Sequence, residues 1–437
     1  MRRLVAGVTA ALTIAAAGLL GLTESGVAGA AAGGPVSSTA ASWTPQLATS
    51  GTDGTVEQVR QIVQCGSTMY AVGKFTQVKN GATVVTRNNA FSFSATNGVI
   101  TAWDPNVNGQ VDTVAFTGGD CSKAFIGGTF TSVGGTTVKN IAKVNTTDTG
   151  TVDTTFFNSS GGRVAHLEAM QGHLLVGGNF AGYLKSVSPA TGRSDGYGTP
   201  AISGNYVFPG VKSNSTRIYN MTPSPDGTAV LMMGVFTSVG GQPRKQIFRL
   251  NLTPGAATVS AWYSPQFNGD CAASEPFYLQ DASWAPDMSK IYIATTGYKP
   301  WNGTVTAPRS GLCDAAAAYS AAETGNLSYL WINYTGCDSL YSTAADTNTV
   351  YIGGHERWAS NPLGCDKAGP GAVAAPGMAG LSPVNGSVIW NPKRGRGLGA
   401  DDMLVTSAGL WVASDNAQNT AMCAGSSGHS GICFLPY

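Results

Sequence analysis

The sequence predicts an all-β protein made of repeated units. Charged residues account for 11% of the 437 residues and 58 residues are glycine, whereas an average globular protein has about 25% charged residues and about 7% glycine. The apolar runs are short, rich in Val, Ile, Phe and Tyr, and bounded by Gly, Asn, Asp and Ser. Such runs are typical of short strands joined by tight turns. The 43% of hydrophobic residues can supply a sizeable core.

One short pattern recurs along the chain. It reads AFIGGTFTSVGG around Gly128, and related segments surround Gly73, Gly178 and Gly234 at spacings of 50 to 56 residues. Weaker versions follow at spacings of 59 to 61 residues, around Thr295, Gly354 and Ser414. Periods of this length indicate an array of supersecondary units rather than independent domains. The chain therefore contains seven predicted units.

Each unit is predicted to hold four strands. A first strand such as 56–63 leads into a second that ends at the glycine motif, and a third such as 140–145 and a fourth such as 99–105 complete a unit. Four strands in each of seven units predict a seven-bladed β-propeller, in which radial repetition avoids long exposed sheet edges. The glycine pairs suit positions where neighbouring backbone approaches closely. We expect residues 31–437 to form this single domain.

A tryptophan tag predicts how the ring closes. Fourth strands carry Trp103, Trp262 and Trp390, each followed by a proline, and the same tag appears at Trp43-Thr44-Pro45 before the first complete unit. The last unit ends at GICFLPY, which supplies only a third strand. The segment around Trp43 is therefore expected to provide the missing outer strand of the last blade.

The repeat resembles a known family. The segment IGGTFTSVGGTTVKNIAKVNTTDTGTVDTTFF, with Asp153 and Phe156 in its Asp-x-x-Phe, is similar to the delta-60 type of bacterial β-propeller repeat. The resemblance covers residues 56–265 well and is weak afterwards. It implies a propeller in exported, often actinobacterial, proteins and implies no single reaction, because propellers carry many functions.

The first thirty residues are predicted to be a signal peptide. Arg2 and Arg3 precede an apolar run from Leu4 to Leu22, and Ala28-Gly29-Ala30 forms a small-x-small cleavage site. We expect a secreted protein without a membrane span after processing. The remaining chain is formally uncharged, which makes nucleic acid and anionic membranes poor candidate partners.

Eight cysteines in an exported chain suggest four disulfides. Positions in the repeat favour the pairs Cys65–Cys121, Cys271–Cys313, Cys337–Cys365 and Cys423–Cys433. No C-x-x-C pair is present, and the chain has four histidines, so neither a structural zinc site nor another metal cluster is expected. No phosphate-binding glycine loop or H-E-x-x-H motif is present, and no cofactor is expected.

A first candidate site lies where first strands begin, at the expected mouth of the central channel. Acidic or amide side chains recur there, at Glu57, at Asp112, at Asp281 beside Gln280, and at Asp402 beside Asp401. They suit binding of a cation or polarisation of a sugar hydroxyl. The alternative is that they hydrogen-bond backbone in the turns between blades.

A second candidate site lies where units five and six abandon the repeat. Tyr298 and Trp301 stand in one loop, and His355, Glu356, Arg357 and Trp358 in the other. Flat aromatic faces with planar donors and acceptors suit sugar rings, so we expect Tyr298, Trp301 and Trp358 to stack on sugars and Arg357 to bind a carboxylate or paired hydroxyls. His355 and Glu356 would form the acid/base pair of an enzyme. The alternative is that these aromatic residues pack the inserted loops.

Together these features predict a propeller that binds an extracellular carbohydrate at the channel mouth. If the protein also cleaves its ligand, it is a glycoside hydrolase or polysaccharide lyase, with Asp281 or Asp402 as a second carboxylate across the mouth from Glu356. The basic run Lys393-Arg394-Gly395-Arg396 is either a solvated turn or a contact for an acidic polysaccharide. The alternative function is a protein-interaction scaffold that presents loops to a cell-surface partner.

Overall fold

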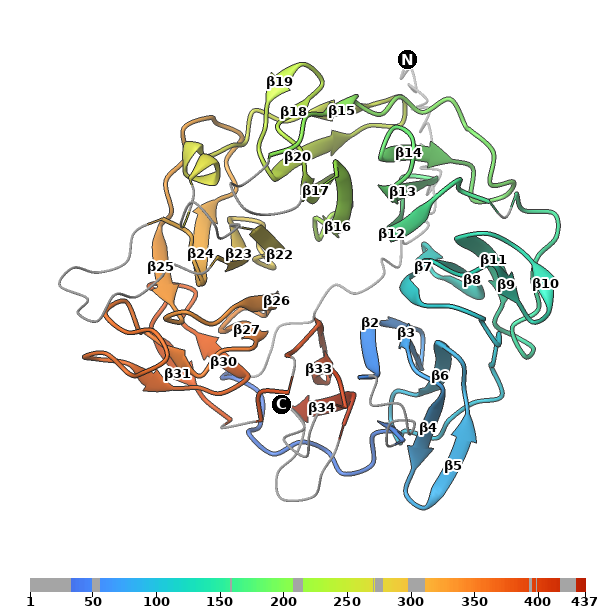
Figure 1. The fold of residues 1–437 in the computed structure, drawn as a ribbon, viewed down its shortest axis with the longest axis horizontal. Helices are drawn as coiled ribbons and strands as arrows, with labels where there is room; N and C mark the ends of the chain where they lie inside the picture. Colours follow the sequence, from blue (N-terminus) through green and yellow to red (C-terminus); the bar gives the residue numbers. More distant parts are fainter. Residues whose placement is uncertain are drawn as a thin grey trace, which may run out of the picture.

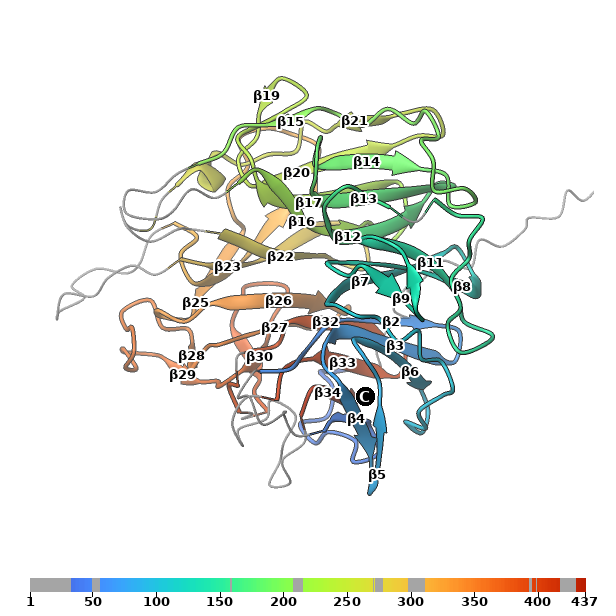
Figure 2. The same ribbon diagram turned by 45° about the vertical axis from the view of Figure 1, so that its right-hand side comes forward.

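The computed structural model describes residues 33–48, 56–157, 159–206, 215–269, 271, 278–297, 311–392, 395–397, 399–416 and 430–437. Within these ranges the chain forms antiparallel sheets arranged around a central space (Figure 1). Turning the molecule shows neighbouring sheets stacked on one another (Figure 2). One short helical turn, η1 (Pro265–Asn268), interrupts the strands. No helix among the described residues is long and apolar enough to cross a membrane.

Each main sheet is a meander whose first strand lies nearest the centre and whose later strands follow outward (Figure 1). Sheet by sheet, the strands are β2 (Gln58–Cys65), β3 (Thr68–Lys74) and β6 (Ala90–Ser94); β7 (Val111–Thr117), β8 (Asp120–Gly128) and β11 (Ile141–Asn145); β12 (Arg163–Met170), β13 (His173–Asn179) and β14 (Leu184–Val187); β16 (Arg217–Pro223), β17 (Ala229–Val235), β20 (Ile247–Leu252) and β21 (Ala257–Val259); β22 (Tyr278–Trp284), β23 (Lys290–Thr296), β24 (Ala315–Ser320) and β25 (Trp331–Tyr334); β26 (Leu340–Ala345), β27 (Val350–Gly354), β30 (Met378–Leu381) and β31 (Val388–Trp390); and β32 (Asp402–Thr406), β33 (Gly409–Ala413) and β34 (Ile432–Pro436).

Smaller sheets extend the loops between the main strands. They consist of β1 (Gln46–Leu47), β4 (Gln77–Asn80) and β5 (Thr83–Thr86); β9 (Ser132–Val133) and β10 (Thr136–Thr137); β15 (Ile202–Ser203), β18 (Ser238–Val239) and β19 (Gln242–Pro243); and β28 (Trp358–Ala359) and β29 (Val373–Ala374). These hairpins lie outside the meanders and leave the first strands free to line the centre.

The hydrophobic core lies between neighbouring sheets. Strands alternate their side chains between two faces, and both faces of each main sheet are covered by the sheets beside it. One cluster joins Val72 of β3 to Val114 of β7, and another joins Ile62 of β2 to Trp411 of β33. The second cluster is important because it packs the last main sheet against the first.

The recurring glycine of the repeat stands opposite an irregularity in the first strand of five units. Gly73 pairs with Val59, beside the point where the register of β2 shifts. A Cβ atom at Gly73 would lie 2.0 Å from the backbone oxygen of Gln58, which no side chain can tolerate. Other members of the motif meet backbone oxygens of their own first strands at 2.1 to 2.4 Å, namely Gly128, Gly178, Gly234 and Gly354. The motif is therefore a requirement of close backbone packing, as predicted.

At two places the tryptophan tag joins a sheet to its successor. Trp103 is 2% exposed, and its indole nitrogen donates a hydrogen bond of 2.9 Å to the backbone oxygen of Asn145 in the next sheet. Trp262 makes the corresponding bond of 2.8 Å to Ser320. At these two positions a buried ring with a satisfied N–H explains the choice of tryptophan. The indole nitrogen of Trp390, in contrast, is buried without a hydrogen-bond partner among the described residues.

The N-terminal segment lies along the last main sheet. The backbone N–H groups of Ser37 and Ala41 donate to Pro436 and Phe434 of β34, and Leu47 N–H donates to Ser430. The ring of Trp43 packs 5.9 Å from that of Trp411 between centroids. The segment is not a regular strand beside β34, however, because β1 pairs with β4 of the first unit instead. It thus contacts both the last and the first units.

Three of the expected disulfides are present. Cys65–Cys121, Cys271–Cys313 and Cys337–Cys365 have Cα–Cα distances of 5.7, 5.7 and 4.6 Å. The first connects the β2–β3 turn to β8 of the next sheet, and so confirms that these turns face each other. The fourth expected pair involves Cys423, which lies outside the described residues.

Candidate functional site at the channel mouth

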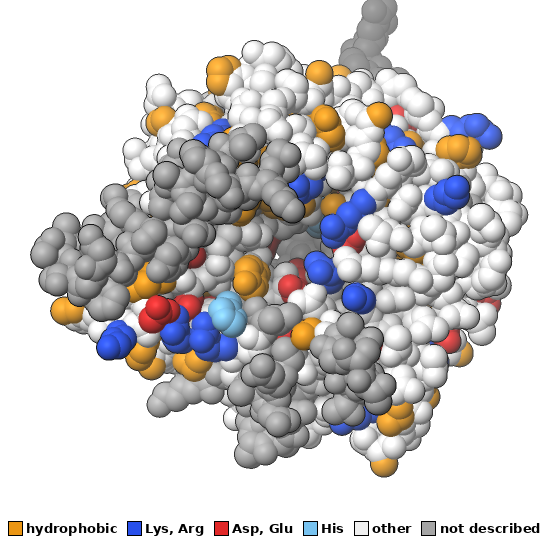
Figure 3. Space-filling model, viewed as in Figure 1, with side chains coloured by type: hydrophobic (Ala, Val, Ile, Leu, Met, Phe, Trp, Pro, Cys, Tyr) orange, Lys and Arg blue, Asp and Glu red, His pale blue; other side chains and the backbone are white. Residues whose placement is uncertain are grey.

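A channel of about 1960 Å³ occupies the centre of the molecule and is lined mainly by first strands. Positively and negatively charged side chains border the hollow at the centre of the face in Figure 3. A concave surface with convergent polar groups is the usual form of a ligand site. The residues that line the channel are therefore the first candidates for function.

A bulge near the start of six of the first strands turns one extra side chain toward the channel. In β2 the pairing with β3 passes from Val59 to Gln61, which leaves Arg60 unpaired in the ladder. The same shift occurs in β7, β12, β16, β22 and β26, and Asp401 takes this place just before β32. Bulges commonly redirect side chains near functional sites. The residues so placed, called the bulge residues below, all line the channel and are Arg60, Asp112, Ala165, Tyr219, Gln280, Tyr341 and Asp401.

Two arginines converge on Asp112. Arg163 donates from Nε and Nη2 to the two carboxylate oxygens, each at 2.8 Å, and Gln110 adds a bond of 2.6 Å. Nε of Arg60 lies 3.9 Å from the same carboxylate. A bidentate pair fixes the planes of both groups. Asp112 thus ties three neighbouring sheets together, and its negative charge is matched by more than one guanidinium.

The carboxyl group of Asp401 has no hydrogen-bond or ion-pair partner among the described residues, and its Oδ2 atom is buried. Burial raises the pKa of Asp401 to about 7, with Asp415 and Asp402 acting in the same direction and Arg60 opposing. Near neutral pH this carboxyl is divided between protonated and ionised forms. It can therefore donate to a ligand oxygen or accept from a ligand hydroxyl.

The residues that follow the bulges connect each first strand to the next. Their side chains bind the backbone of the neighbouring strand: Gln61 accepts from Val114 at 2.6 Å, Thr113 from Leu167 at 3.1 Å, Asp281 from Thr343 at 2.8 Å, Asp402 from Ile62 at 2.9 Å, and Ser342 donates to Ala400 at 2.9 Å. The bond between Asp402 and Ile62 joins the last main sheet to the first. These hydrogen bonds, made by Gln61, Thr113, Asp281, Ser342 and Asp402, are called the belt below. The belt holds the bulge residues in fixed positions relative to one another.

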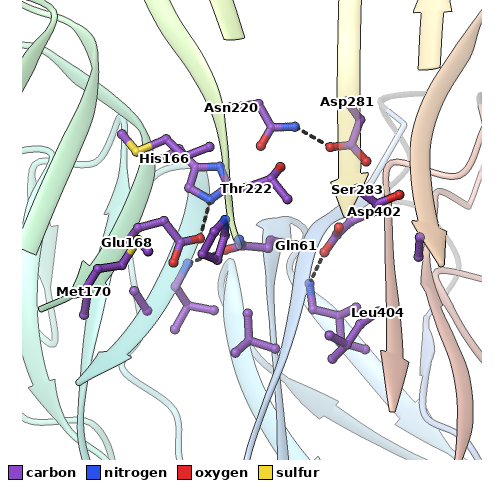
Figure 4. Close-up of a pocket in the computed structure, with 18 of the residues that line it drawn as sticks. Gln61, His166, Glu168, Met170, Asn220, Thr222, Asp281, Ser283, Asp402 and Leu404 are labelled. Atoms are coloured by element: carbon purple, nitrogen blue, oxygen red, sulfur yellow. Dashed lines mark hydrogen bonds and ion pairs between the residues drawn. The ribbon is translucent and has the colours of Figure 1, made fainter. Parts of the chain in front are cut away.

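His166 departs from the belt. Its Nε2 atom lies 3.1 Å from Oε1 of Glu168 in the same strand (Figure 4). In the two first strands that follow, Asn220 of β16 donates to Asp281 of β22 at 2.8 Å (Figure 4). Burial raises the pKa of Asp281 to about 7 and that of Asp402 to about 6. Glu168, Asp281 and Asp402 line the channel below its mouth and give it an acidic interior.

The structure gives defined partners to four of the five acidic residues predicted at the mouth, the exception being Asp401. Glu57 is 6% exposed and accepts bonds of 3.0 and 2.8 Å from the N–H and hydroxyl of Thr76. Asp112 binds Arg163, and Asp281 and Asp402 bind backbone between sheets, which is the alternative stated for them above. Asp112, Asp281 and Asp402 line the channel, and Glu57 does not. A role of these carboxylates in ligand binding stays a prediction.

The described residues of the second candidate site do not line the channel. Neither His355 nor Glu356 lines it, and Glu356 is 0% exposed with no hydrogen-bond partner for either carboxylate oxygen among the described residues. Burial raises the pKa of Glu356 well above its usual value. Burial also lowers the pKa of His355, and Arg396 adds to that effect. An acid/base role for this pair stays a prediction that requires the carboxyl to become accessible.

Glu356 occupies the place of the repeat phenylalanine. It follows Gly354 by two residues, as Phe75 follows Gly73. Its backbone oxygen accepts from Gly377 N–H at 2.9 Å, as that of Phe75 accepts from Asn89 at 3.0 Å. Phe75, Phe130 and Phe236 are each at most 1% exposed. The carboxyl of Glu356 thus enters a pocket that other units fill with an aromatic ring.

Arg357 is bound within its own loop. Its guanidinium donates to both oxygens of Asp338 at 2.8 Å and also contacts Asp366. Because Asp338 and Asp366 each follow a cysteine of the Cys337–Cys365 disulfide, the three residues brace that crosslink. Trp358 is half-buried in β28, while Tyr298 and Trp301 lie outside the described residues. Their contacts with a ligand stay predictions.

We expect the protein to be less stable at pH 8 than at pH 5. The folded-state pKa of Asp401 is raised above its unfolded value of 3.8, so the folded chain binds more protons and stability falls as pH rises from about 4 to about 7. The substitution Asp401→Asn should reduce this fall by roughly 1–4 kcal/mol. Urea unfolding at both pH values measures it.

Asp287→Asn is the matched control for this titration. The pKa of Asp287 is lowered by its hydrogen bonds with Ser289, so its contribution to stability changes only at pH values below the range compared. The difference between pH 5 and pH 8 should therefore equal that of the natural chain. If Asp401→Asn also leaves the difference unchanged, Asp401 is ionised across this range.

Sequence reasoning missed Arg60, Arg163 and Tyr341 as channel-lining residues. In an uninterrupted strand the side chains alternate, and Arg60 then reads as an ordinary outward residue of VEQVRQIV. A usable signal was present, because several first strands carry two consecutive polar or aromatic residues between their apolar positions, as in Arg60-Gln61 and Tyr219-Asn220. Such a pair is the mark of a bulge that opens a strand toward a central channel.

One family model matches part of the chain. Its description is "Domain of unknown function (DUF5122) beta-propeller", and it matches residues 123–156, the segment with the clearest repeat. No curated protein matches significantly.

Solved structures are similar in fold over most of the chain. "Structure of U3-55K" matches with a TM-score of 0.50 at 9% identity, covering 94% of this chain and 100% of that chain. "Crystal structure of the Saccharomyces cerevisiae Sqt1" gives 0.50 at 9% identity, covering 90% and 100%. "Crystal structure of WD40 beta propeller domain of Doa1" gives 0.40 at 11% identity, covering 85% and 94%. The predicted all-β propeller fold is confirmed.

Proposed function

We propose that this protein is a secreted seven-bladed propeller that binds an extracellular carbohydrate at its channel mouth. The observation that carries the proposal is the set of bulge residues, which presents guanidinium, carboxyl, amide and phenol groups at the entrance of an open channel. Sugar hydroxyls pair with such groups, and Tyr219 and Tyr341 offer ring faces to sugar C–H groups. The belt beneath preorganises these side chains, which reduces the entropy lost on binding.

The proposal includes seven blades, closure of the ring by the N-terminal segment, and a delta-60 type of repeat from an actinobacterial-like source. Closure is supported by the bond between Asp402 and Ile62 and by the contacts of Ser37 and Ala41 with β34. Secretion is supported by the signal-like residues 1–30 and by disulfides, which persist in oxidising compartments.

We propose binding rather than cleavage as the main activity. A glycoside hydrolase uses two accessible carboxyl groups about 5–10 Å apart. Asp112 is held by Arg163, and Asp281 and Asp402 are held by backbone N–H groups. Glu356 is sealed from solvent. Asp401 remains as a carboxyl without a partner among the described residues, and it suits recognition of a hydroxyl.

Retention of soluble glycans on the immobilised full chain tests the proposal. We expect Asp401→Ala and Gln280→Ala to weaken retention about tenfold each, because each removes a hydrogen bond to the ligand. A parallel reducing-sugar assay should detect no release; release would establish an enzyme instead. Absence of retention for every glycan would favour the protein-interaction scaffold.

The loops of units five and six are tested in the same assay. If Trp301 and Trp358 stack on sugar faces, replacing both by Ala should weaken retention about two- to tenfold per ring while leaving the urea unfolding midpoint unchanged. A lower midpoint with retention per folded molecule intact would instead identify them as packing residues. The glycan would then bind through the bulge residues alone.

A further inference from the structure

Three arginines gather at one side of the channel mouth. Arg60 is the bulge residue of β2, and Arg163 and Arg217 are the first residues of the neighbouring strands β12 and β16. The latter two occupy the same register, because Arg163 pairs with Asn179 and Arg217 with Val235 at the ends of their second strands. All three line the channel. The bulge residue of β12 is Ala165, whose small side chain leaves space beside Arg163.

These arginines exceed the carboxylates that face them. Asp112 is bound by Arg163 at 2.8 Å and lies 3.9 Å from Arg60. Nε of Arg60 is buried without a hydrogen-bond partner. Arg217 has no carboxylate partner in the described part of the chain, where its Nη1 donates only to the backbone oxygen of Ser215 at 3.3 Å. Among the described residues, the mouth therefore holds guanidinium charge that the neighbouring side chains do not neutralise.

The interior of the channel is lined by acidic groups instead of arginines. Glu168, Asp281 and Asp402 line it below the arginines. A negatively charged ligand group is attracted to the arginines at the mouth, whereas the deeper carboxyl groups offer it no positive charge. This arrangement favours a ligand that places one negative group at the rim and does not thread the channel.

We propose that the ligand is an acidic saccharide whose negatively charged group binds Arg60, Arg163 and Arg217, while one of its hydroxyls bonds to Asp401. This inference rests on the proposed function and adds the chemical class of the glycan. Arginine forks match the paired oxygens of a carboxylate or sulfate group. A uronate and a sulfated sugar share this chemistry, so probes of both kinds are needed.

The test compares acidic glycans with neutral counterparts on the immobilised full chain. The probes are polygalacturonate, hyaluronan and dextran sulfate, with carboxyl-reduced polygalacturonate and dextran as neutral partners. We expect retention of at least one acidic probe and about tenfold weaker retention of its neutral partner, because the bond to a charged group is lost. Retention should also fall as salt increases, since the mouth is open to solvent. Retention of dextran sulfate alone would support the proposal and identify sulfate as the bound group.

Arg217→Gln is the decisive variant, because this arginine is in no internal ion pair of the described chain. It should weaken retention of the acidic probe about tenfold without changing the urea midpoint. Arg193→Gln removes the same charge from a residue that stacks on Phe157 away from the channel, and should leave retention unchanged. Equal losses in both variants, or equal retention of neutral and acidic probes, would overturn the inference while leaving the proposed function intact. Failure to retain any probe, neutral or acidic, would count against both.

Discussion

Removal of residues 31 to 50 is expected to lower the free energy of unfolding by about 3–6 kcal/mol, because burial of each large apolar side chain contributes roughly 1.5–3 kcal/mol. Val36 and Leu47 are 2% and 1% exposed, and Trp43 packs on Trp411 and Phe434. Deletion would also leave β34 with an unpaired edge. Urea unfolding of the oxidised chain measures the loss.

A chain that begins at residue 33 is the matched control, because it keeps every contact just described. It should unfold like the longer chain. Adding a synthetic peptide of residues 31–50 to the shortened protein should raise its unfolding midpoint, since an extended segment can pair with an exposed sheet edge from outside. An unchanged midpoint after the deletion would show that this segment does not hold the two ends of the array together.

The fold was accessible from the sequence because its determinants are local and repeated. Gly73 and the glycines at the same place in later units recur because a Cβ atom there would collide with backbone, so the pattern marks the end of each second strand directly. Trp103 and Trp262 recur because each bridges to the next sheet. The pair Cys65–Cys121 followed from the same periodicity, since equivalent turns of adjacent units face each other. Cys271–Cys313 and Cys337–Cys365 followed from matched positions, one cysteine after a fourth strand and the other in the long loop of the next unit.

The site was less accessible because its partners are distant in the chain. Asp112 was identified at the mouth, but its partner Arg163 lies 51 residues away in another sheet, and no spacing rule connects them. Likewise the bond from Asp402 to Ile62 spans 340 residues. Sequence reasoning placed these carboxyl groups near the channel, while only the structure shows which of them are already occupied.

The sequence correctly indicates that units five and six depart from the repeat pattern. At Glu356, however, the replaced residue is a core phenylalanine, so the change places a carboxyl inside the packing between strands rather than at a surface. An argument from residue type alone assigns an acid to catalysis. The register of the repeat, which aligns Glu356 with Phe75, would have predicted its burial.

Replacing Glu356 by Phe is expected to raise the free energy of unfolding by about 2 kcal/mol at pH 7. A buried polar group without a partner costs about 1–3 kcal/mol, and a ring in the same pocket adds apolar burial. Glu356→Leu, which is nearer in volume to the natural residue, should also stabilise if the pocket has contracted around the smaller side chain. Urea unfolding measures both variants.

Two further variants distinguish the effect of the pocket on stability from the effect of the carboxyl charge. The folded-state pKa of Glu356 is raised, so its contribution to stability falls as pH rises above the unfolded pKa of 4.5. The variant Glu356→Gln should remove that fall while changing stability little at pH 5. Phe75→Glu places the same acid in the equivalent pocket of the first unit and should destabilise the protein by several kcal/mol, about 3 or more. If Phe75→Glu is tolerated, the pocket accepts acids generally. If both Glu356→Phe and Glu356→Leu destabilise, then the buried carboxyl makes a contact that stabilises the fold, and the phenylalanine pocket is not its determinant.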